Sequence, residues 1–174
     1  MVEETHSIAG FMERFFASGG RPGAPDGRPL YAYRCTQSEL EAVAPLLARS
    51  VHWPGLSRAN KQVAGAFDLY VAEWWRRSYS GGAWSWDGVF ESLGVERPPY
   101  AEIQSAAQRG LRWWKRPSVV LGGRQLLLAT LACEGGLPLG VLHRHGAWVR
   151  RYLSSLLEDL RIYGKSGTEP PDEL

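Results

Sequence analysis

Apolar side chains recur along this chain at spacings of three and four residues, in several separate segments. The longest such segment runs from Ser57 to about Tyr79, and its stripe consists of Val63, Phe67, Tyr70, Val71 and Trp74. A stripe with this spacing is typical of an amphipathic helix that buries one face. Similar patterns, bounded by capping residues, glycines or prolines, predict further helices over 7–18, 36–50, 87–93, 98–116, 124–134 and 145–163.

The connections between these segments are mostly short. Residues 19–29 are rich in glycine, proline, arginine and aspartate, which predicts a loop. Aromatic side chains alternate from Leu30 to Cys35, which favours a short strand. The pattern predicts a mainly α, single compact domain of six or seven helices with at most one short strand or hairpin. We expect this domain to cover 1–163 and a flexible tail or linker to cover 164–174.

The composition is that of an ordered globular protein, since 44% of the 174 residues are hydrophobic and 22% are charged. These fractions exclude disordered, collagen-like and coiled-coil chains. The most apolar stretch, 126–133, is much shorter than the ~20 residues that cross a bilayer, so no membrane partner is expected. Cys35 and Cys133 are too few for a disulfide framework, although they leave one bridge open, and a reducing cytoplasm is the expected location.

Charge is nearly balanced, with 20 Lys and Arg against 18 Asp and Glu. Two tryptophan pairs, within 73–77 and 112–116, are nevertheless each followed by two cations. Such a pattern could stack bases and hold phosphates, but cations at helix ends also suit the helix dipole, and we favour that structural interpretation. The candidate nucleic-acid-binding residues are Arg76, Arg77, Arg109, Arg112, Lys115 and Arg116.

The chain carries no nucleophile elbow, phosphate-binding loop, dinucleotide fingerprint or zinc-protease motif. His143 and His145 have too few cysteine or histidine neighbours at usable spacing for zinc, so we expect neither metal nor cofactor. Glu73 lies on an otherwise apolar helix, where a carboxylate must find a partner or shift its pKa. An arginine partner in a structural ion pair is the favoured interpretation. An enzyme with a carboxylate–arginine site around Glu73 ranks last.

Eight tryptophans against five phenylalanines indicate either a thick aromatic core or an interface. Trp53, Trp84 and Trp86 lie in expected loops and are the candidate partner-binding residues. Residues 135–139 predict a helix C-cap followed by a proline turn that docks Leu137 and Leu139.

Three sequence segments carry a resemblance to a known family. Residues 27–34 (GRPLYAYR), 69–86 (LYVAEWWRR followed by GG-x-W-x-W) and 134–139 (EGGLPL) occur in the order seen in YjiT-like proteins. These are very large bacterial proteins of genomic defence islands, and they include the large partner subunit of type III Druantia anti-phage systems. The chain resembles their N-terminal region from about Phe11 to Tyr163, as a piece of such a protein or a free-standing relative.

The resemblance implies cytoplasmic bacterial immunity beside a large helicase-like partner, with room for contact with DNA, and it carries over no catalytic residue. We therefore expect a non-enzymatic interaction module that holds a protein partner or an adjoining domain of a defence complex. A DNA-contacting module that uses the basic ends of the two Trp-Trp helices is the alternative.

Overall fold

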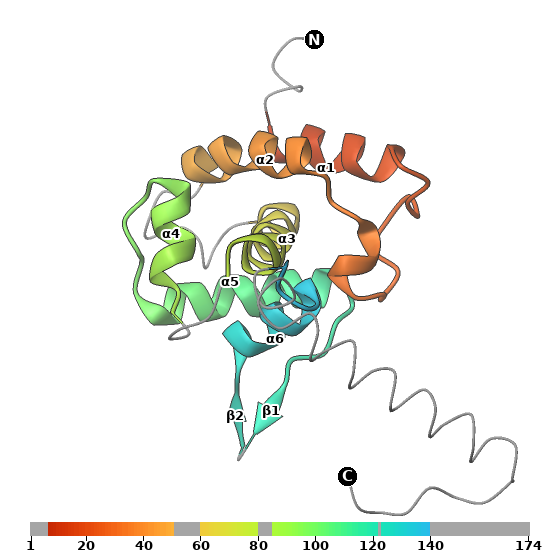
Figure 1. Ribbon diagram of the computed structural model, residues 1–174. Helices are drawn as coiled ribbons and strands as arrows, with labels where there is room; N and C mark the ends of the chain where they lie inside the picture. Colours follow the sequence, from red (N-terminus) through yellow and green to blue (C-terminus); the bar gives the residue numbers. More distant parts are fainter. Residues whose placement is uncertain (1–6, 51–59, 80–84, 122, 140–174) are drawn as a thin grey trace, which may run out of the picture.

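The computed structural model describes residues 7–50, 60–79, 85–121 and 123–139. A central helix, α3 (Lys61–Ser78), contacts every other helix in this part of the chain. Figure 1 shows α3 nearly end-on, with α1 and α2 along the top, α4 at the left, and α5 and α6 below. The surrounding elements are α1 (Ile8–Ala17), α2 (Gln37–Ser50), α4 (Asp87–Leu93), α5 (Tyr100–Trp113), α6 (Leu127–Gly135), and the 3-10 helix η2 (Leu30–Tyr33).

Helix α3 can occupy the centre because small residues let its neighbours approach closely. An added Cβ at Gly110 of α5 would overlap the Ala64 carbonyl oxygen, and one at Gly135 of α6 would overlap the backbone of Ala72. Gly65 leaves room for the ring of Trp113 in the same way. The backbones of α5 and α6 therefore lie directly against α3.

Aromatic rings fill the space between α1, η2 and the end of α5. The rings of Tyr33 and Trp114 lie 4.8 Å apart, and Phe16 packs edge-on against Tyr33. The indole N–H of Trp114 donates to the Gly65 carbonyl at 2.9 Å, so the largest buried side chain has its polar atom satisfied. The core is rich in tryptophan and phenylalanine, which fits a thick aromatic core, one of the two interpretations that the tryptophan content left open.

The mainly α fold is confirmed, with six α-helices in the part of the chain that the structure describes. A capping box starts α2, because Thr36 N donates to Glu39 Oε2 at 2.8 Å and Glu39 N donates to Thr36 Oγ1 at 3.2 Å. Pro45 lies inside α2, which continues past it as one helix. The predicted helix over 145–163 and tail over 164–174 lie outside the described residues.

Three local predictions were wrong. Leu30–Tyr33 is a 3-10 helix rather than a strand, since Pro29 starts a tight turn in which Ala32 N donates to the Pro29 carbonyl at 2.9 Å. The helix expected from Arg124 begins at Leu127, and the preceding residues form a hairpin of β1 (Val120–Leu121) and antiparallel β2 (Arg124–Gln125). Helix α3 begins at Lys61 rather than Ser57, because Asn60 caps the amides of Gln62 and Val63.

Among the described residues, no helix has the length and apolar character needed to cross a membrane.

Candidate interaction surface and the ion pairs that support it

Glu73 lies in the last two turns of α3 and is 2% exposed. Its Oε2 accepts from Nη2 of Arg76 at 2.7 Å and from Nε of Arg77 at 3.0 Å. Arg77 also donates to the Cys35 carbonyl at 2.6 Å and to Gln37 Oε1 at 3.0 Å. The predicted arginine partner is confirmed, and the cluster joins the end of α3 to the segment between η2 and α2. Glu73 is engaged as a structural ion pair rather than open to a substrate.

A second buried carboxylate, Glu134, holds the end of α6 in place. Its Oε1 accepts from Arg116 Nε at 2.8 Å, and its Oε2 accepts from the backbone N–H of Leu30 at 3.1 Å. Arg116 also donates to the Gly27 carbonyl at 2.7 Å. One cation therefore connects the chain after α5 to α6 and to the loop before η2, which gives Arg116 a structural role.

A third carboxylate, Asp68, is fully buried in the middle of α3 against Gly110. Neither of its oxygens has a hydrogen-bond partner among the described residues. Burial raises the pKa of Asp68 well above its ordinary value of 3.8, and the charge of Glu134 raises it further. The neutral acid is therefore the favoured form of this side chain.

The six candidate nucleic-acid-binding cations do not form one free basic surface. Arg76, Arg77 and Arg116 are bound to the buried carboxylates of Glu73 and Glu134. Arg112 donates through Nε to the Gln108 carbonyl at 3.1 Å, Arg109 is half-buried, and Lys115 is exposed.

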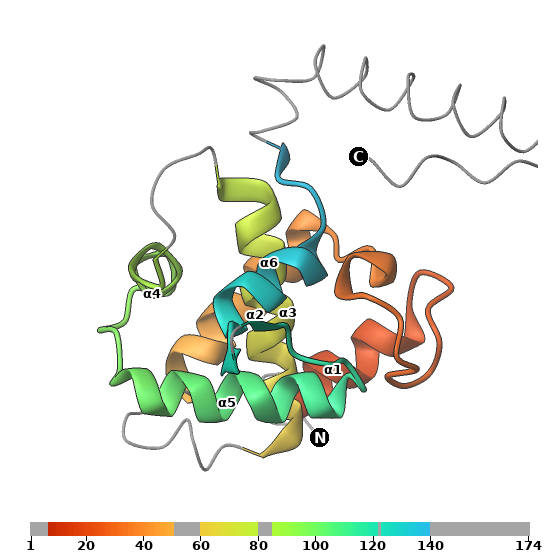
Figure 2. The same cartoon turned by 90° about the horizontal axis from the view of Figure 1, so that it is seen from below.

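The two basic helix ends are also separated along α3. Trp114 at the end of α5 is bonded to Gly65, which lies eleven residues before Arg76, or about 16 Å along the helix axis. Figure 2 shows α5 crossing towards the N-terminal end of α3, while the C-terminal end of α3 points away from it. Arg112 and Lys115 therefore lie on a different part of the surface from Arg76 and Arg77.

Of the candidate partner-binding tryptophans, Trp53 and Trp84 lie outside the described residues. Trp86 is only 5% exposed, and its ring stacks on Phe67 at 6.2 Å and approaches Phe90 at 6.4 Å. Trp86 is thus a core residue in this structure, because its place just before α4 turns the ring inwards.

Half of the large apolar side chains that are exposed among the described residues lie instead around the end of α6. Tyr31, Leu137 and Leu139 are 51%, 60% and 46% exposed. They border two adjoining hollows of about 690 and 470 Å³, which share Gly136 and Leu137, and which we call the α6 cleft. The other residues that line the cleft are Arg34, Cys35, Trp75, Arg76, Tyr79, Ala132, Cys133, Gly135 and Pro138.

Sequence reasoning recognised the turn at 135–139 but not the surface that it creates. Gly136 ends α6 with a positive φ of 79°, as a C-cap glycine should. The turn then presents Leu137 and Leu139 to solvent instead of docking both, which corrects the expectation. Arg76 connects this surface to the ion pairs, because it both lines the cleft and binds Glu73.

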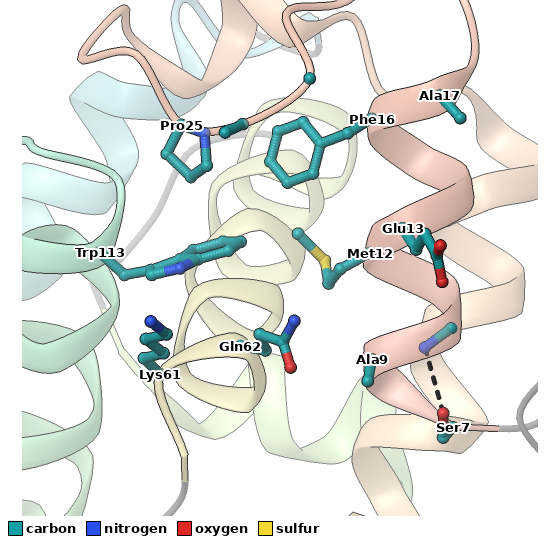
Figure 3. Close-up of a pocket in the computed structure, with 13 residues that line it drawn as sticks. Ser7, Ala9, Met12, Glu13, Phe16, Ala17, Pro25, Lys61, Gln62 and Trp113 are labelled. Atoms are coloured by element: carbon teal, nitrogen blue, oxygen red, sulfur yellow. Dashed lines mark hydrogen bonds between the residues drawn. The ribbon is translucent and has the colours of Figure 1, made fainter.

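A further hollow of about 640 Å³ lies between α1 and the start of α3 (Figure 3). Met12, Phe16 and Trp113 form its apolar part, while Lys61 and Gln62 lie at one side. Trp113 can reach this position because it rests against Gly65. The two tryptophans of the second Trp-Trp pair therefore have different environments. Trp114 lies in the core, and Trp113 is half-buried at the surface.

Within the described ranges, no three His, Cys, Asp or Glu side chains are grouped so as to hold a metal ion. Cys35 and Cys133 are both free thiols, the first buried and the second exposed. His143 and His145 lie outside these ranges.

Two comparisons with known proteins found a match. The family described as the YjiT N-terminal domain matches residues 2–137. The protein YjiT of Escherichia coli (strain K12) is similar to this chain, with 35% identity over 146 residues, which are 82% of this chain and 28% of that relative. The chain therefore spans less than a third of the length of the curated relative that it matches. No solved structure matches the chain.

Proposed function

The chain belongs to the YjiT N-terminal domain family, and we propose that it is a non-enzymatic interaction module that holds a neighbouring domain or a protein partner. The observation that carries this proposal is the α6 cleft. Three of the six large hydrophobic side chains that are exposed in the described residues lie on it. Apolar surface gathered in one place on a protein is a usual mark of a binding surface.

The position of the cleft also supports the proposal. Leu139 lines it and is the last described residue, so whatever follows in the chain emerges beside it. The matched region is 28% of the YjiT relative, which leaves most of that protein to be held by such a module. Two ion pairs hold the walls of the cleft in place. The Glu73 pair fixes Arg76 on one wall, and the Glu134 pair fixes the end of α6 on the other.

We place this module in bacterial anti-phage defence, in the cytoplasm, on the resemblance of its motifs to the defence-island proteins. Within such a complex the module would position a larger catalytic partner. The expected cellular outcome is that charge substitution in the cleft lowers protection against phage infection while the protein remains folded and present at its normal level.

The direct test is binding between this chain and the polypeptide that follows the matched region in YjiT of Escherichia coli. Leu137→Glu/Leu139→Glu places two charges in the cleft and should weaken binding at least about tenfold. Val119→Glu/Val120→Glu is the matched control, since both valines are exposed on or beside the hairpin, away from the cleft. Equal binding by all three chains, or by none, would contradict this role for the cleft.

The DNA-contacting alternative is weakened by the pairing of its cations. Arg76, Arg77 and Arg116 hold buried carboxylates, so few phosphate contacts remain to supply affinity. Its test uses Arg112→Glu/Lys115→Glu, which spares Arg116 and therefore the Glu134 ion pair. Salt-dependent binding to single- or double-stranded DNA that disappears in this variant would favour the alternative over the interaction module.

A further inference from the structure

A small hollow of about 290 Å³ lies where the chain leaves α5 and turns into the hairpin of β1 and β2 (Figure 1). We call it the α5–hairpin hollow. It shares no lining residue with the α6 cleft, and none of its lining residues, all of which the structure describes, is an Asp or a Glu. The lining consists of Gln108, Leu111, Arg112, Arg116, Pro117, Ser118 and Gln125.

The two arginines of the lining are held by other parts of the chain and still keep unused donors. Arg116 donates from Nε to Glu134 at 2.8 Å and from Nη1 to the Gly27 carbonyl at 2.7 Å. Arg112 donates from Nε to the Gln108 carbonyl at 3.1 Å. Among the described residues, Nη2 of Arg116 and both Nη atoms of Arg112 have no acceptor. These N–H groups are therefore available to a ligand.

Two neutral side chains add further donors to the same hollow. Oε1 of Gln125 accepts from Nε2 of Gln108, which leaves the amide nitrogen of Gln125 without an acceptor in the described part of the chain. The hydroxyl group of Ser118 likewise makes no hydrogen bond to a described residue, and Ser118 is half-buried in the hollow. The donors come from α5, from the segment after it and from β2, so they surround the hollow from three sides.

This set of donors favours an anion, and a phosphate group fits it best. Planar guanidinium groups are the usual protein partners of phosphate, because each can donate two parallel hydrogen bonds. A carboxylate has two oxygens to accept hydrogen bonds, whereas a phosphate group has at least three and can use both arginines together with the neutral donors. The volume lies at the lower end of the range for small-molecule pockets, which suits one such group.

We propose that the α5–hairpin hollow binds one phosphate group, either as free phosphate or as the phosphate of a mononucleotide. Arg112 and Arg116 supply the positive charge, and Ser118 and Gln125 supply neutral hydrogen bonds. This site goes beyond the proposed function, since the hollow and the α6 cleft have no residue in common. It also differs from the DNA-contacting alternative, because binding to DNA depends on many phosphate contacts along a surface.

The first test titrates the full chain with inorganic phosphate at pH 8 and constant ionic strength, and it follows the amide NMR signal of Ser118. We expect this signal to shift and to saturate. Arg112→Gln should weaken binding at least about tenfold, because it removes charge-assisted hydrogen bonds. Lys115→Gln is the matched control, since Lys115 is an exposed cation that does not line the hollow, and it should change the affinity by at most about twofold.

A second pair of variants tests the neutral side of the hollow. Gln125→Glu keeps an oxygen that can accept from Gln108 but replaces the amide donor with a negative charge, so it should also weaken phosphate binding at least about tenfold. Gln62→Glu places the same charge at the start of α3, outside the hollow, and should bind phosphate like the natural chain. Circular dichroism of each variant establishes that it remains folded.

The ligand is identified by titrations with adenosine 5′-monophosphate and with acetate. Tighter binding of the nucleotide than of inorganic phosphate assigns the site to a nucleotide, and equal binding assigns it to the phosphate group alone. No saturable shift, equal affinity for acetate, or undiminished binding by Arg112→Gln would overturn the proposal. An oligonucleotide without a terminal phosphate that displaces inorganic phosphate would also overturn it, in favour of the DNA-contacting alternative. The α6 cleft is tested separately by Leu137→Glu/Leu139→Glu, so each site can fail without the other.

Discussion

Two carboxylates on α3 are buried to the same degree but in opposite environments. Asp68 is 0% exposed and Glu73 is 2% exposed, five residues further along. Glu73 receives two guanidinium groups, whereas Asp68 faces Gly110 and has no hydrogen-bond partner among the described residues. The chain therefore keeps a charge buried at one end of the helix and excludes charge from its middle.

The difference follows from what surrounds each position. The end of α3 is close enough to solvent for Arg76 and Arg77 to keep about a fifth of their side chains exposed while their heads reach Glu73. The middle of α3 lies under α5 and α6, whose backbones approach so closely that no long cation fits. A buried carboxylate without a cation is stable only when it is protonated. The two regions should therefore respond differently to the same kind of substitution.

The largest expected effect comes from Glu73→Gln. Removing one partner of a buried pair leaves two guanidinium groups without their acceptor charge, which should cost about 3 kcal/mol in the free energy of unfolding. That loss corresponds to a fall in Tm of roughly 6–12 °C for a domain of this size. Glu41→Gln, at an exposed glutamate of α2, is the control and should change Tm little. Similar Tm values for the two variants would show that the buried pair contributes no net stability.

Gly110→Ala should have the next largest effect, because it changes the region of Asp68 without changing charge. The added methyl group would overlap both the Asp68 carboxyl group and the Ala64 carbonyl, so α5 must move away from α3. We expect a loss of about 2–3 kcal/mol in urea unfolding. Gly23→Ala is the control, since a Cβ there meets no atom within 4 Å. An equal, small effect at both positions would mean that the helix contact is loose.

The pH dependence of stability separates the two carboxylates directly. The pKa of Asp68 is raised well above 3.8 in the folded chain, so the folded state holds a proton that the unfolded state releases above that pH. The natural chain should therefore lose stability as pH rises from about 4 towards the raised pKa, by up to about 1.4 kcal/mol per pH unit. Asp68→Asn removes this contribution.

Urea unfolding between pH 5 and pH 7 measures the effect. The free energy of unfolding of Asp68→Asn should fall less steeply with pH than that of the natural chain, so the variant gains relative stability at the higher pH. Asp87→Asn, at an exposed aspartate of α4, should give a curve parallel to that of the natural chain. Parallel curves for Asp68→Asn as well would show that Asp68 is ionised in the folded protein.

The contrast between the two carboxylates also explains which of their contacts could be predicted from the sequence. The partners of Glu73 were predictable because Arg76 and Arg77 follow at three and four residues, on the same side of a helix. The isolation of Asp68 depends on Gly110, which is far away in sequence, and no local pattern indicates it. Within the described residues, sequence patterns therefore predicted the helices and one ion pair, but not which helices meet.

The exposed apolar surface could not be predicted either, because it depends on the geometry of turns that the local sequence pattern does not show. Leu30–Tyr33 alternates like a strand, yet Pro29 and a left-handed Arg34, with φ of 54°, close it into a 3-10 turn. The α6 cleft needs this turn beside the end of α6, where Tyr31 lies near Gly136. A binding surface made by two turns that are distant in sequence has no signature in either segment.

The smallest expected losses of stability come from replacing, one at a time, the two arginines that bind Glu73. Arg77→Lys keeps the positive charge but loses the planar group that also bonds the Cys35 carbonyl and Gln37 Oε1, so it should cost about 1 kcal/mol in urea unfolding. Arg76→Lys should cost only about 0.5 kcal/mol, because Nε and Nη2 of Arg76 both donate to Glu73, which a lysine can still neutralise. The order of the two losses matters more than their size, because a larger loss for Arg77→Lys shows that Arg77 connects α3 to α2. Equal losses would mean that the cluster stabilises the fold through charge alone, and that the wall of the α6 cleft does not depend on the geometry of Arg77.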